Sequence, residues 1–258
     1  MTHTFVVPAF GEAKWLERCL DSLQKQTRTS EVLVTTSTPN AMAESLCSQR
    51  AIRLIVNPVS AGIASDWNFA LRQAASDWVT LAHQDDWYAA DYAESILNAA
   101  ATSVNTVLVF TAATEAVEGS SRTGMNPLVK GLMCDAVFMG ATSIASRFRK
   151  RLLLSFGNPI PCPSVAINRR ALPAFTFQDG WFSNLDWIAW LALADQAGTF
   201  GYVRRPLVHR TLHPGAATKV GLTHRTREDG LVLSMLWPRP LSTVIGALYA
   251  GGRSPYRK

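Results

Sequence analysis

Two adjacent carboxylates, Asp85 and Asp86, follow the apolar segment WVTLA, with His83 and Gln84 immediately before them. Like charges at this spacing repel each other unless a cation neutralises them. Carboxylate oxygens suit hard divalent ions such as Mg²⁺ or Mn²⁺, which commonly bridge a protein to a substrate diphosphate. We therefore expect Asp85 to belong to a ligand site. For Asp86, a site role and the capping of a helix beginning near Trp87 are equally open, because Asp is a favoured N-cap.

Alternating strand and helix patterns place these carboxylates at the rim of a sheet. Apolar, β-branched runs predict strands, and apolar residues spaced i, i+3, i+4 and i+7 predict helices between them. The alternation predicts an α/β fold with a Rossmann-type, mostly parallel sheet covered by helices on both faces. In such sheets ligands bind outside the carboxyl ends of the strands, where HQDD falls. The predicted strands are 4–8, 31–36, 51–56 and 77–82, and the predicted helices are 12–26, 40–49 and 62–75.

A second polar group lies near the start of the helix predicted over 62–75. Asp66 and Asn68 stand near N–H groups and the positive end of the helix dipole, where anion or ribose contacts are favoured. Trp67 falls on the apolar stripe and is expected in the core. The chain contains neither G-x-G-x-x-G nor G-x-x-x-x-G-K-[ST], so its sheet must hold a phosphate ligand by another device.

In their order and spacing, the segments FVVPAFGEAKWLERCLDSLQKQT, EVLVTTSTPN, NPVSAGIASDWNFAL and WVTLAHQDDWY resemble family 2 glycosyltransferases of the GT-A fold, of the type that builds bacterial surface or capsular polysaccharide. The resemblance continues through GNPIPCPSVAINRRAL, NLDWIAWLAL and PLVHRTLHPGAATK. It implies a GT-A domain over 1–220, with a nucleotide-binding half (1–112) and an acceptor and catalytic half (113–220). Residues 221–258 are expected to form a basic, helical C-terminal extension.

The resemblance also implies a set of nucleotide-sugar contacts. The segment from Pro8 to Glu12 looks like the family's first nucleotide-contacting loop. Thr36 lies where many members carry an aspartate that reads the base, and this chain offers the hydroxyls of TTSTP instead. The expected contacts are Pro8, Ala9, Phe10, Glu12, Thr36, Asp66, Asn68, Gln84 and Asp85.

The metal motif of the family is altered here. Its D-x-D pattern aligns His83 with the first carboxylate and Asp85 with the last, so Asp85 and the adjoining Asp86 are retained. The resemblance implies a divalent cation, Mn²⁺ or Mg²⁺, held by Asp85 and by His213, with Asp86 and His83 as less favoured ligands. A hydrogen-bonded strand-end histidine is the alternative for His83, because these ions prefer oxygen.

Inverting sugar transfer requires a base for the acceptor hydroxyl and stabilisation of the departing diphosphate. Asp186 matches the aspartate of the family's E-D-W-like motif, with Leu185 in place of the preceding acid. We expect Asp186 to be the base, since apolar Trp neighbours could raise its proton affinity. The alternative is that Asp186 only satisfies the dipole and amides at the start of a helix over 187–196. His209 is expected to be structural, and the role of Arg210 stays open.

Positive charge is concentrated in the second half of the chain. Residues 1–146 hold 9 Lys and Arg against 14 Asp and Glu, whereas residues 147–258 hold 16 against 5. No recognition motif for nucleic acid accompanies this excess, so we expect no nucleic-acid partner. The stretch 146–154 and the tail from 237 suggest peripheral contact with an anionic membrane or a lipid-linked diphosphate. A solvated basic face, or a tail that caps the domain, is the alternative.

Cysteine usage and hydropathy suggest a cellular location. Four cysteines without a C-x-x-C pair fit a reducing cytoplasm. We expect neither a signal peptide nor a membrane-spanning segment, and a location in the cytoplasm or on the inner face of the cell membrane. Residues 113–145 have poor periodicity and are expected to form an acceptor-side loop or lid.

The sequence therefore predicts an inverting, metal-dependent glycosyltransferase. It would move a sugar from a nucleotide-sugar donor, with UDP favoured, to a hydroxyl of a glycan or a lipid-linked glycan. Two alternatives remain open at this stage. One is a non-catalytic subunit that binds nucleotide or glycan, and the other is a sugar nucleotidyltransferase, for which Lys14 lies one turn too far into its helix.

Overall fold

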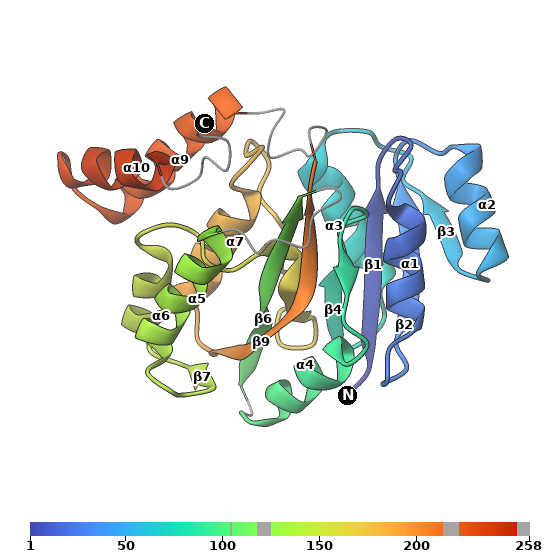
Figure 1. Ribbon diagram of the computed structural model, residues 1–258, viewed down its shortest axis with the longest axis horizontal. Helices are drawn as coiled ribbons and strands as arrows, with labels where there is room; N and C mark the ends of the chain where they lie inside the picture. The colour runs from blue at the N-terminus through green and yellow to red at the C-terminus, as the bar shows by residue number, and fades with distance from the viewer. Residues whose placement is uncertain (104, 118–124, 214–221, 252–258) are drawn as a thin grey trace.

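The computed structural model of the protein describes residues 1–103, 105–117, 125–213 and 222–251. These residues form a nine-stranded sheet with helices on both faces, as Figure 1 shows. The strands are β1 (His3–Ala9), β2 (Glu31–Thr36), β3 (Arg53–Val56), β4 (Trp78–Leu81), β5 (Trp87–Tyr88), β6 (Thr106–Val117), β7 (Ser143–Ile144), β8 (Val165–Asn168) and β9 (Thr199–Leu212). The helices are α1 (Leu16–Gln24), α2 (Ala41–Gln49), α3 (Ile63–Gln73), α4 (Tyr92–Ala101), α5 (Met125–Phe138), α6 (Arg147–Leu154), the 3₁₀ turn η1 (Cys162–Ser164), α7 (Leu185–Ala194), α9 (Leu222–Leu236) and α10 (Leu241–Gly251).

The strand order places several carboxyl ends at one edge of the sheet. The order is β3-β2-β1-β4-β8-β6-β9-β5, with β7 paired to β9. Strands β1 to β4 pair in parallel, and β6 pairs in parallel with β9. Strand β8 is antiparallel to both β4 and β6, so β9 runs in the same direction as β4. The predicted mostly parallel sheet is confirmed, and the carboxyl end of β9 meets those of β1, β2 and β4.

Apolar side chains alternate between two cores, one on each face of the sheet. In β1, Phe5 and Val7 face a core that α1, α2 and α4 cover, whereas Val6 faces the core of α3, α6 and α7. This alternation follows from the two-residue period of a strand. Trp67 belongs to the second core with 8% of its surface exposed, as its place on the apolar stripe of α3 predicts.

The structure around Trp87 differs from the helix that the sequence analysis considers near this residue. Trp87 and Tyr88 form the short strand β5, which pairs with His209 and Val208 of β9. Helix α4 begins only at Tyr92. The capping alternative for Asp86 is therefore wrong, because no helix starts next to it.

Most described residues of the segment 113–145 belong to regular elements, which corrects the expected loop for them, whereas residues 118–124 lie outside the described residues. Strand β6 extends to Val117, helix α5 covers Met125–Phe138, and β7 follows. Cys134 and Phe138 anchor α5 in the core. Their contacts are tertiary, which explains why the weak periodicity of this segment did not predict the helix.

The basic stretch of α6 is occupied by contacts within the protein. Lys150 is fully buried and donates to two backbone carbonyls that follow α7. Arg149 donates to carbonyls at the end of α5. Arg147 and Arg151 both pair with Asp195. The expectation of a free, lipid-facing basic element is therefore wrong for most of this stretch.

Helices α9 and α10 form a hairpin at one end of the molecule (Figure 1). Val232 and Leu233 of α9 are fully buried in the same core as Trp187. Tyr249 of α10 packs edge to face on Trp187, with 5.5 Å between ring centroids. None of the helices in the described part of the chain combines the length and the apolar character that a membrane-spanning segment requires.

Candidate functional site

The turn after β4 gathers the first group of polar side chains. The amide of Asp86 donates to the carbonyl of His83 over 3.1 Å, which closes the turn. One ligand atom each from His83, Asp85 and Asp86 lie within 4.8 Å of one another. Asp86 is buried with 3% of its surface exposed, whereas Asp85 is partly exposed at the rim. The two carboxylates thus have different surroundings.

Asp86 is held from the neighbouring strand. The amide of Thr211 in β9 donates to Asp86 Oδ1 over 3.0 Å. Burial and the charge of Asp85 raise the pKa of Asp86 well above its usual value. A cation at this point would offset both effects, because it favours the ionised form of each carboxylate.

His213 reaches the same group from the end of β9. Its Nε2 lies 3.0 Å from Asp85 Oδ2, and its ring packs in a tilted arrangement against Trp15, with 3.9 Å between ring centroids. Arg18 of α1 donates to Thr211 and so ties the start of α1 to the end of β9. The structure therefore brings the two expected metal ligands, Asp85 and His213, into direct contact.

His83 supplies a test of whether these residues fit a metal. Its Nε2 atom is buried and has no hydrogen-bond partner among the described residues. Burial lowers the pKa of His83 to about 4, so the ring is the neutral form that can ligate a metal. The other ring nitrogen, Nδ1, lies 3.9 Å from Asp86 Oδ2, and an imidazole nitrogen beside two carboxylates is a donor set that Mn²⁺ accepts. The residues therefore fit a divalent cation.

The loop after β1 is fixed by Gln84. The Gln84 side chain accepts from the amide of Phe10 over 2.9 Å and donates to its carbonyl over 3.1 Å. The Phe10 ring is left 61% exposed, while Ala9 is buried. Pro8 lies within β1, which continues one residue beyond the end predicted from the proline, and Glu12 is exposed. Gln84 therefore positions the loop on which the expected donor contacts lie.

Hydroxyl groups line the carboxyl end of β2. Thr36 is buried, and its Oγ1 accepts from the amide of Thr38 over 3.0 Å. The Thr38 hydroxyl accepts from the amide of Gly11, a residue with φ of +61°. Asp66 of α3 joins this group because it accepts from the Ser37 hydroxyl over 2.9 Å. The carboxylate of Asp66 thus lies near the end of β2, where this chain has Thr36 in the position at which many family members carry an aspartate.

Asn68 has a structural role that the sequence did not reveal. Its amide donates to the carbonyl of Phe177 over 2.8 Å and accepts from the amide of the same residue over 2.7 Å. Both polar atoms of Asn68 are used in this pair. The Asn68 side chain therefore holds the backbone of Phe177 to α3, which leaves neither of its polar atoms free of this pair.

Asp186 lies in the first turn of α7. Its Oδ2 accepts from Asn158 Nδ2 over 2.9 Å, and its Oδ1 accepts from the amide of Trp187 over 2.8 Å. Burial raises the pKa of Asp186, and the nearby charges of Lys130 and Arg210 oppose that rise. A carboxyl with raised proton affinity suits proton transfer better than an ordinary surface aspartate does.

Arg210 stands between the two groups of carboxylates, and the sequence left it without a role. Its Nη1 pairs with Glu115 over 2.8 Å, and its buried Nε has no hydrogen-bond partner among the described residues. Arg210 is close enough to Asp86 and Asp186 to lower the pKa of both. His209 stacks on Trp87 at 3.8 Å, in line with the structural role expected for it.

Lys130 and Glu115 are further site residues that sequence reasoning missed. Both line a small cavity of about 20 Å³ next to Arg210, which is room for about one water molecule. Burial lowers the pKa of Lys130 to about 8. Glu115 lies directly opposite Arg210 in the β6 and β9 register. The period-two pattern of β6 gives Glu115 an inward position, but only the strand pairing identifies its partner.

Comparison with known sequences identifies the family. A family model described as "Glycosyl transferase family 2" matches residues 4–173. Glycosyltransferase GlyA of Streptococcus pneumoniae serotype 4 is 26% identical over 98 residues, which are 36% of this chain and 14% of that relative. The match therefore spans only a small part of the relative's length.

Comparison with solved structures identifies the fold. S. aureus TarS in complex with UDP-GlcNAc superposes with a TM-score of 0.65 at 15% identity, covering 98% of this chain and 72% of that chain. The mannosyltransferase PcManGT from Pyrobaculum calidifontis, in complex with GDP-Man and Mn²⁺, gives 0.62 at 16% identity, with 96% and 68% covered. Glucosyl-3-phosphoglycerate synthase from Mycobacterium tuberculosis, in complex with Mn²⁺, UDP and glucosyl-3-phosphoglycerate, gives 0.58 at 17% identity, with 91% and 80% covered. At these identities the likeness shows the GT-A fold.

Proposed function

The chain belongs to glycosyl transferase family 2, and from this premise we propose that it transfers a sugar with inversion from a UDP-linked donor to an acceptor hydroxyl. The acceptor is a glycan or a lipid-linked glycan of surface polysaccharide assembly. The observation that carries the proposal is the contact between Asp85 and His213, which brings together, at the carboxyl-terminal rim of the sheet, the two residues to which we assign the cation.

Asp85 and His213 hold the divalent cation in this proposal, with Asp86 and His83 beside them. When bound, the cation neutralises charge on the donor diphosphate and makes it a better leaving group. Arg210 supplies a fixed positive charge between this group and Asp186, which supports a role in stabilising the departing diphosphate. Its pairing with Glu115 over 2.8 Å keeps the guanidinium from turning away.

Asp186 acts as the general base. The acceptor hydroxyl oxygen forms a bond to the anomeric carbon while the bond from that carbon to the diphosphate oxygen breaks, and the hydroxyl proton passes to Asp186. The leaving diphosphate takes the electron pair of the broken bond. The bond from Asn158 keeps the Asp186 carboxylate oriented through its second oxygen. Attack from the face opposite the diphosphate inverts the anomeric configuration.

Donor recognition falls to the hydroxyls after β2 and to Asp66. A uracil ring offers one N–H donor and two carbonyl acceptors, which the Asp66 carboxylate and the Thr36 to Thr38 hydroxyls can match. The loop from Pro8 to Glu12 contacts the base and ribose in this proposal. The UDP-GlcNAc complex of TarS and the UDP complex of the M. tuberculosis synthase support UDP, whereas the GDP-Man complex of PcManGT leaves the base to be tested.

A donor panel tests this proposal. UDP-, GDP- and dTDP-sugars are measured by thermal shift with and without Mn²⁺, because a ligand that binds the native state raises the melting temperature by mass action. Turnover is then followed as release of nucleoside diphosphate. We expect Asp186→Asn to abolish turnover and keep donor binding. Binding without turnover in the unaltered protein would support a non-catalytic subunit instead, and pyrophosphate release from UTP and a sugar phosphate would support a nucleotidyltransferase.

The domain limits and location stay part of the proposal. We assign donor binding to 1–112, acceptor binding and catalysis to 113–220, and a helical extension to 221–258. We propose a cytoplasmic location with peripheral membrane contact, and the contact is supported by α10, where Leu241, Val244 and Leu248 are exposed. Arg239 is exposed nearby, while both carboxylates of the described part of 222–251 are buried. We expect the protein to sediment with phosphatidylglycerol vesicles and not with phosphatidylcholine vesicles. Absence of binding to both kinds of vesicle would contradict the membrane contact.

A further inference from the structure

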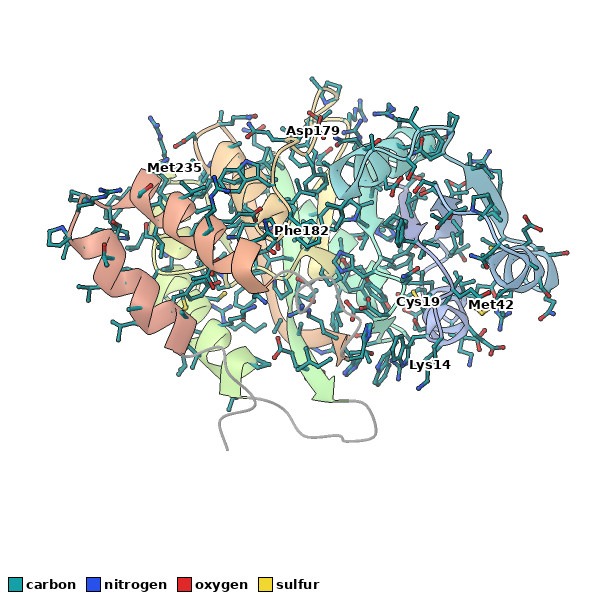
Figure 2. All side chains as sticks on the ribbon, turned by 90° about the horizontal axis from the view of Figure 1, so that it is seen from above. Lys14, Cys19, Met42, Asp179, Phe182 and Met235 are labelled. Carbon is teal, nitrogen blue, oxygen red and sulfur yellow. The ribbon has the colours of Figure 1, made fainter. Side chains whose placement is uncertain are left out.

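A carboxylate from α9 binds the loop that leads into α7. Glu228 Oε1 accepts from the amide of Phe182 over 2.7 Å, and Oε2 accepts from the amides of Ser183 and Asn184 over 2.8 and 3.0 Å. Glu228 is buried, with 8% of its surface exposed. Phe182, labelled in Figure 2, lies beside the helical hairpin in the view from above. One side chain thus satisfies three consecutive backbone N–H groups.

A second carboxylate of α9 reinforces this contact. Asp229 is 5% exposed and accepts from Asn184 Nδ2 over 2.8 Å. Asn184 is the N-cap of α7, yet its own side chain makes no capping hydrogen bond. Two carboxylates from α9 therefore stand at the N-terminus of α7, where negative charge is favourable. The amides that Glu228 accepts from precede the first residue of α7, so α9 holds the loop that leads into this helix.

Asp186 follows this loop by two residues. Its carboxylate is fixed on one side by Asn158 and on the other by the amide of Trp187, so its place depends on where the first turn of α7 begins. Any shift of the 182–184 backbone moves that turn. We propose that Glu228 is a positioning residue for Asp186, and that it sets the place of this carboxylate by holding the backbone of residues 182–184. The inference rests on the proposed function, in which Asp186 is the base.

The proposal gives α9 a role in the reaction. The family model ends at residue 173, so neither α7 nor α9 lies in the matched segment. Glu228 accepts from three backbone amides, so it acts on the loop and not through a bond to Asp186. Its effect must therefore be exerted on the geometry of attack and not on donor binding. The positioning role can therefore be tested by measuring kcat and donor affinity separately.

The test compares Glu228→Ala and Glu228→Gln with Arg227→Gln, which alters an exposed neighbour on the same helix. We expect Glu228→Ala to lower kcat by about 10- to 100-fold, since a misplacement of about 1 Å can cost that much. Its donor KM and its Kd for UDP with Mn²⁺ should stay within about twofold of the unaltered protein. Glu228→Gln retains one oxygen acceptor, so its kcat should fall less than that of Glu228→Ala. Arg227→Gln should match the unaltered protein.

Two readouts separate positioning from a loss of structure. The acid limb of the pH profile of kcat should move in Glu228→Gln, because the surroundings of Asp186 change with the turn that carries it. A folded Glu228→Gln with unchanged kcat and unchanged acid limb overturns the proposal. Equal losses of UDP affinity and kcat also overturn it, since they indicate general damage. If Glu228→Ala does not fold, Glu228→Gln decides.

The same series distinguishes this inference from the proposed function. If Asp186→Asn retains turnover, the assignment of the base fails, whatever Glu228 does. If Asp186→Asn is inactive while both Glu228 variants are folded and fully active, only the positioning role fails.

Discussion

His213 Nε2 lies 3.0 Å from Asp85 Oδ2, although 128 positions separate the two residues in the chain. The contact arises because β9 runs in the same direction as β4, so both strands end at the same edge of the sheet. The ring of Trp15 packs in a tilted arrangement against the His213 ring. The rim that binds the cation in our proposal is thus assembled from α1, the turn after β4 and the end of β9.

Replacing His213 or Asp85 should weaken cation binding. We expect His213→Ala to reduce the affinity for Mn²⁺ in the presence of UDP by about 10- to 100-fold, since the loss of a metal ligand or its close support typically costs this much. Titration calorimetry measures the affinity. His224→Ala removes an exposed histidine and is the control. Unchanged Mn²⁺ affinity in both His213→Ala and Asp85→Asn would contradict the site.

Activity should fall at low pH through the titration of Asp186. A base must be ionised, and because burial raises the pKa of Asp186, the acid limb should lie above the ordinary range of an aspartate, which is about 3.9. Asn158→Ala removes a donor to the carboxylate and so disfavours the charged form. We therefore expect the acid limb of kcat to move to higher pH in Asn158→Ala. A shift to lower pH would contradict the assignment.

Arg210 should be required for the chemical step. We expect Arg210→Gln to lower kcat by about 10²- to 10³-fold, as the loss of a fixed positive group at a developing charge does. Arg210→Lys should retain only part of the kcat of the unaltered protein, because an ammonium lacks the planar guanidinium fork that pairs with Glu115. Arg205→Gln, on the exposed part of the same strand, is the control. Steady-state release of UDP measures the kcat of each variant. Full activity in Arg210→Gln would contradict the role of Arg210 in the chemical step.

Gly157 should be required for stability. The residue has φ of +136°, and a Cβ added there would lie 2.3 Å from Cε2 of Tyr249. Gly180 also has a positive φ, of +88°, but nothing lies within 4 Å of an added Cβ. Gly157→Ala should therefore lower the free energy of unfolding by roughly 1–3 kcal/mol more than Gly180→Ala does. Urea denaturation measures both, and equal losses would show that the contact with α10 contributes nothing.

Local patterns determined much of the first half of the fold. Strand β2 and helices α2 and α3 lie where the sequence predicts them, because each buries one continuous apolar strand or one helical stripe. Trp67 is buried for the same reason. The rim position of Asp85 followed from a strand that ends just before it. Helix α5 was not predictable in this way, since its anchors Cys134 and Phe138 gain their partners only in the folded chain.

Motif order in the sequence by itself determined the fold class, the family and the candidate residues Asp85, Asp186 and His213. Only the tertiary structure decided which groups meet. It pairs Arg210 with Glu115 and links Glu228 to the loop before α7, and it uses Asn68 to hold Phe177. The reason is that periodicity records which face of an element is buried, whereas the partner of a buried polar group depends on strand order and on helices distant in the chain.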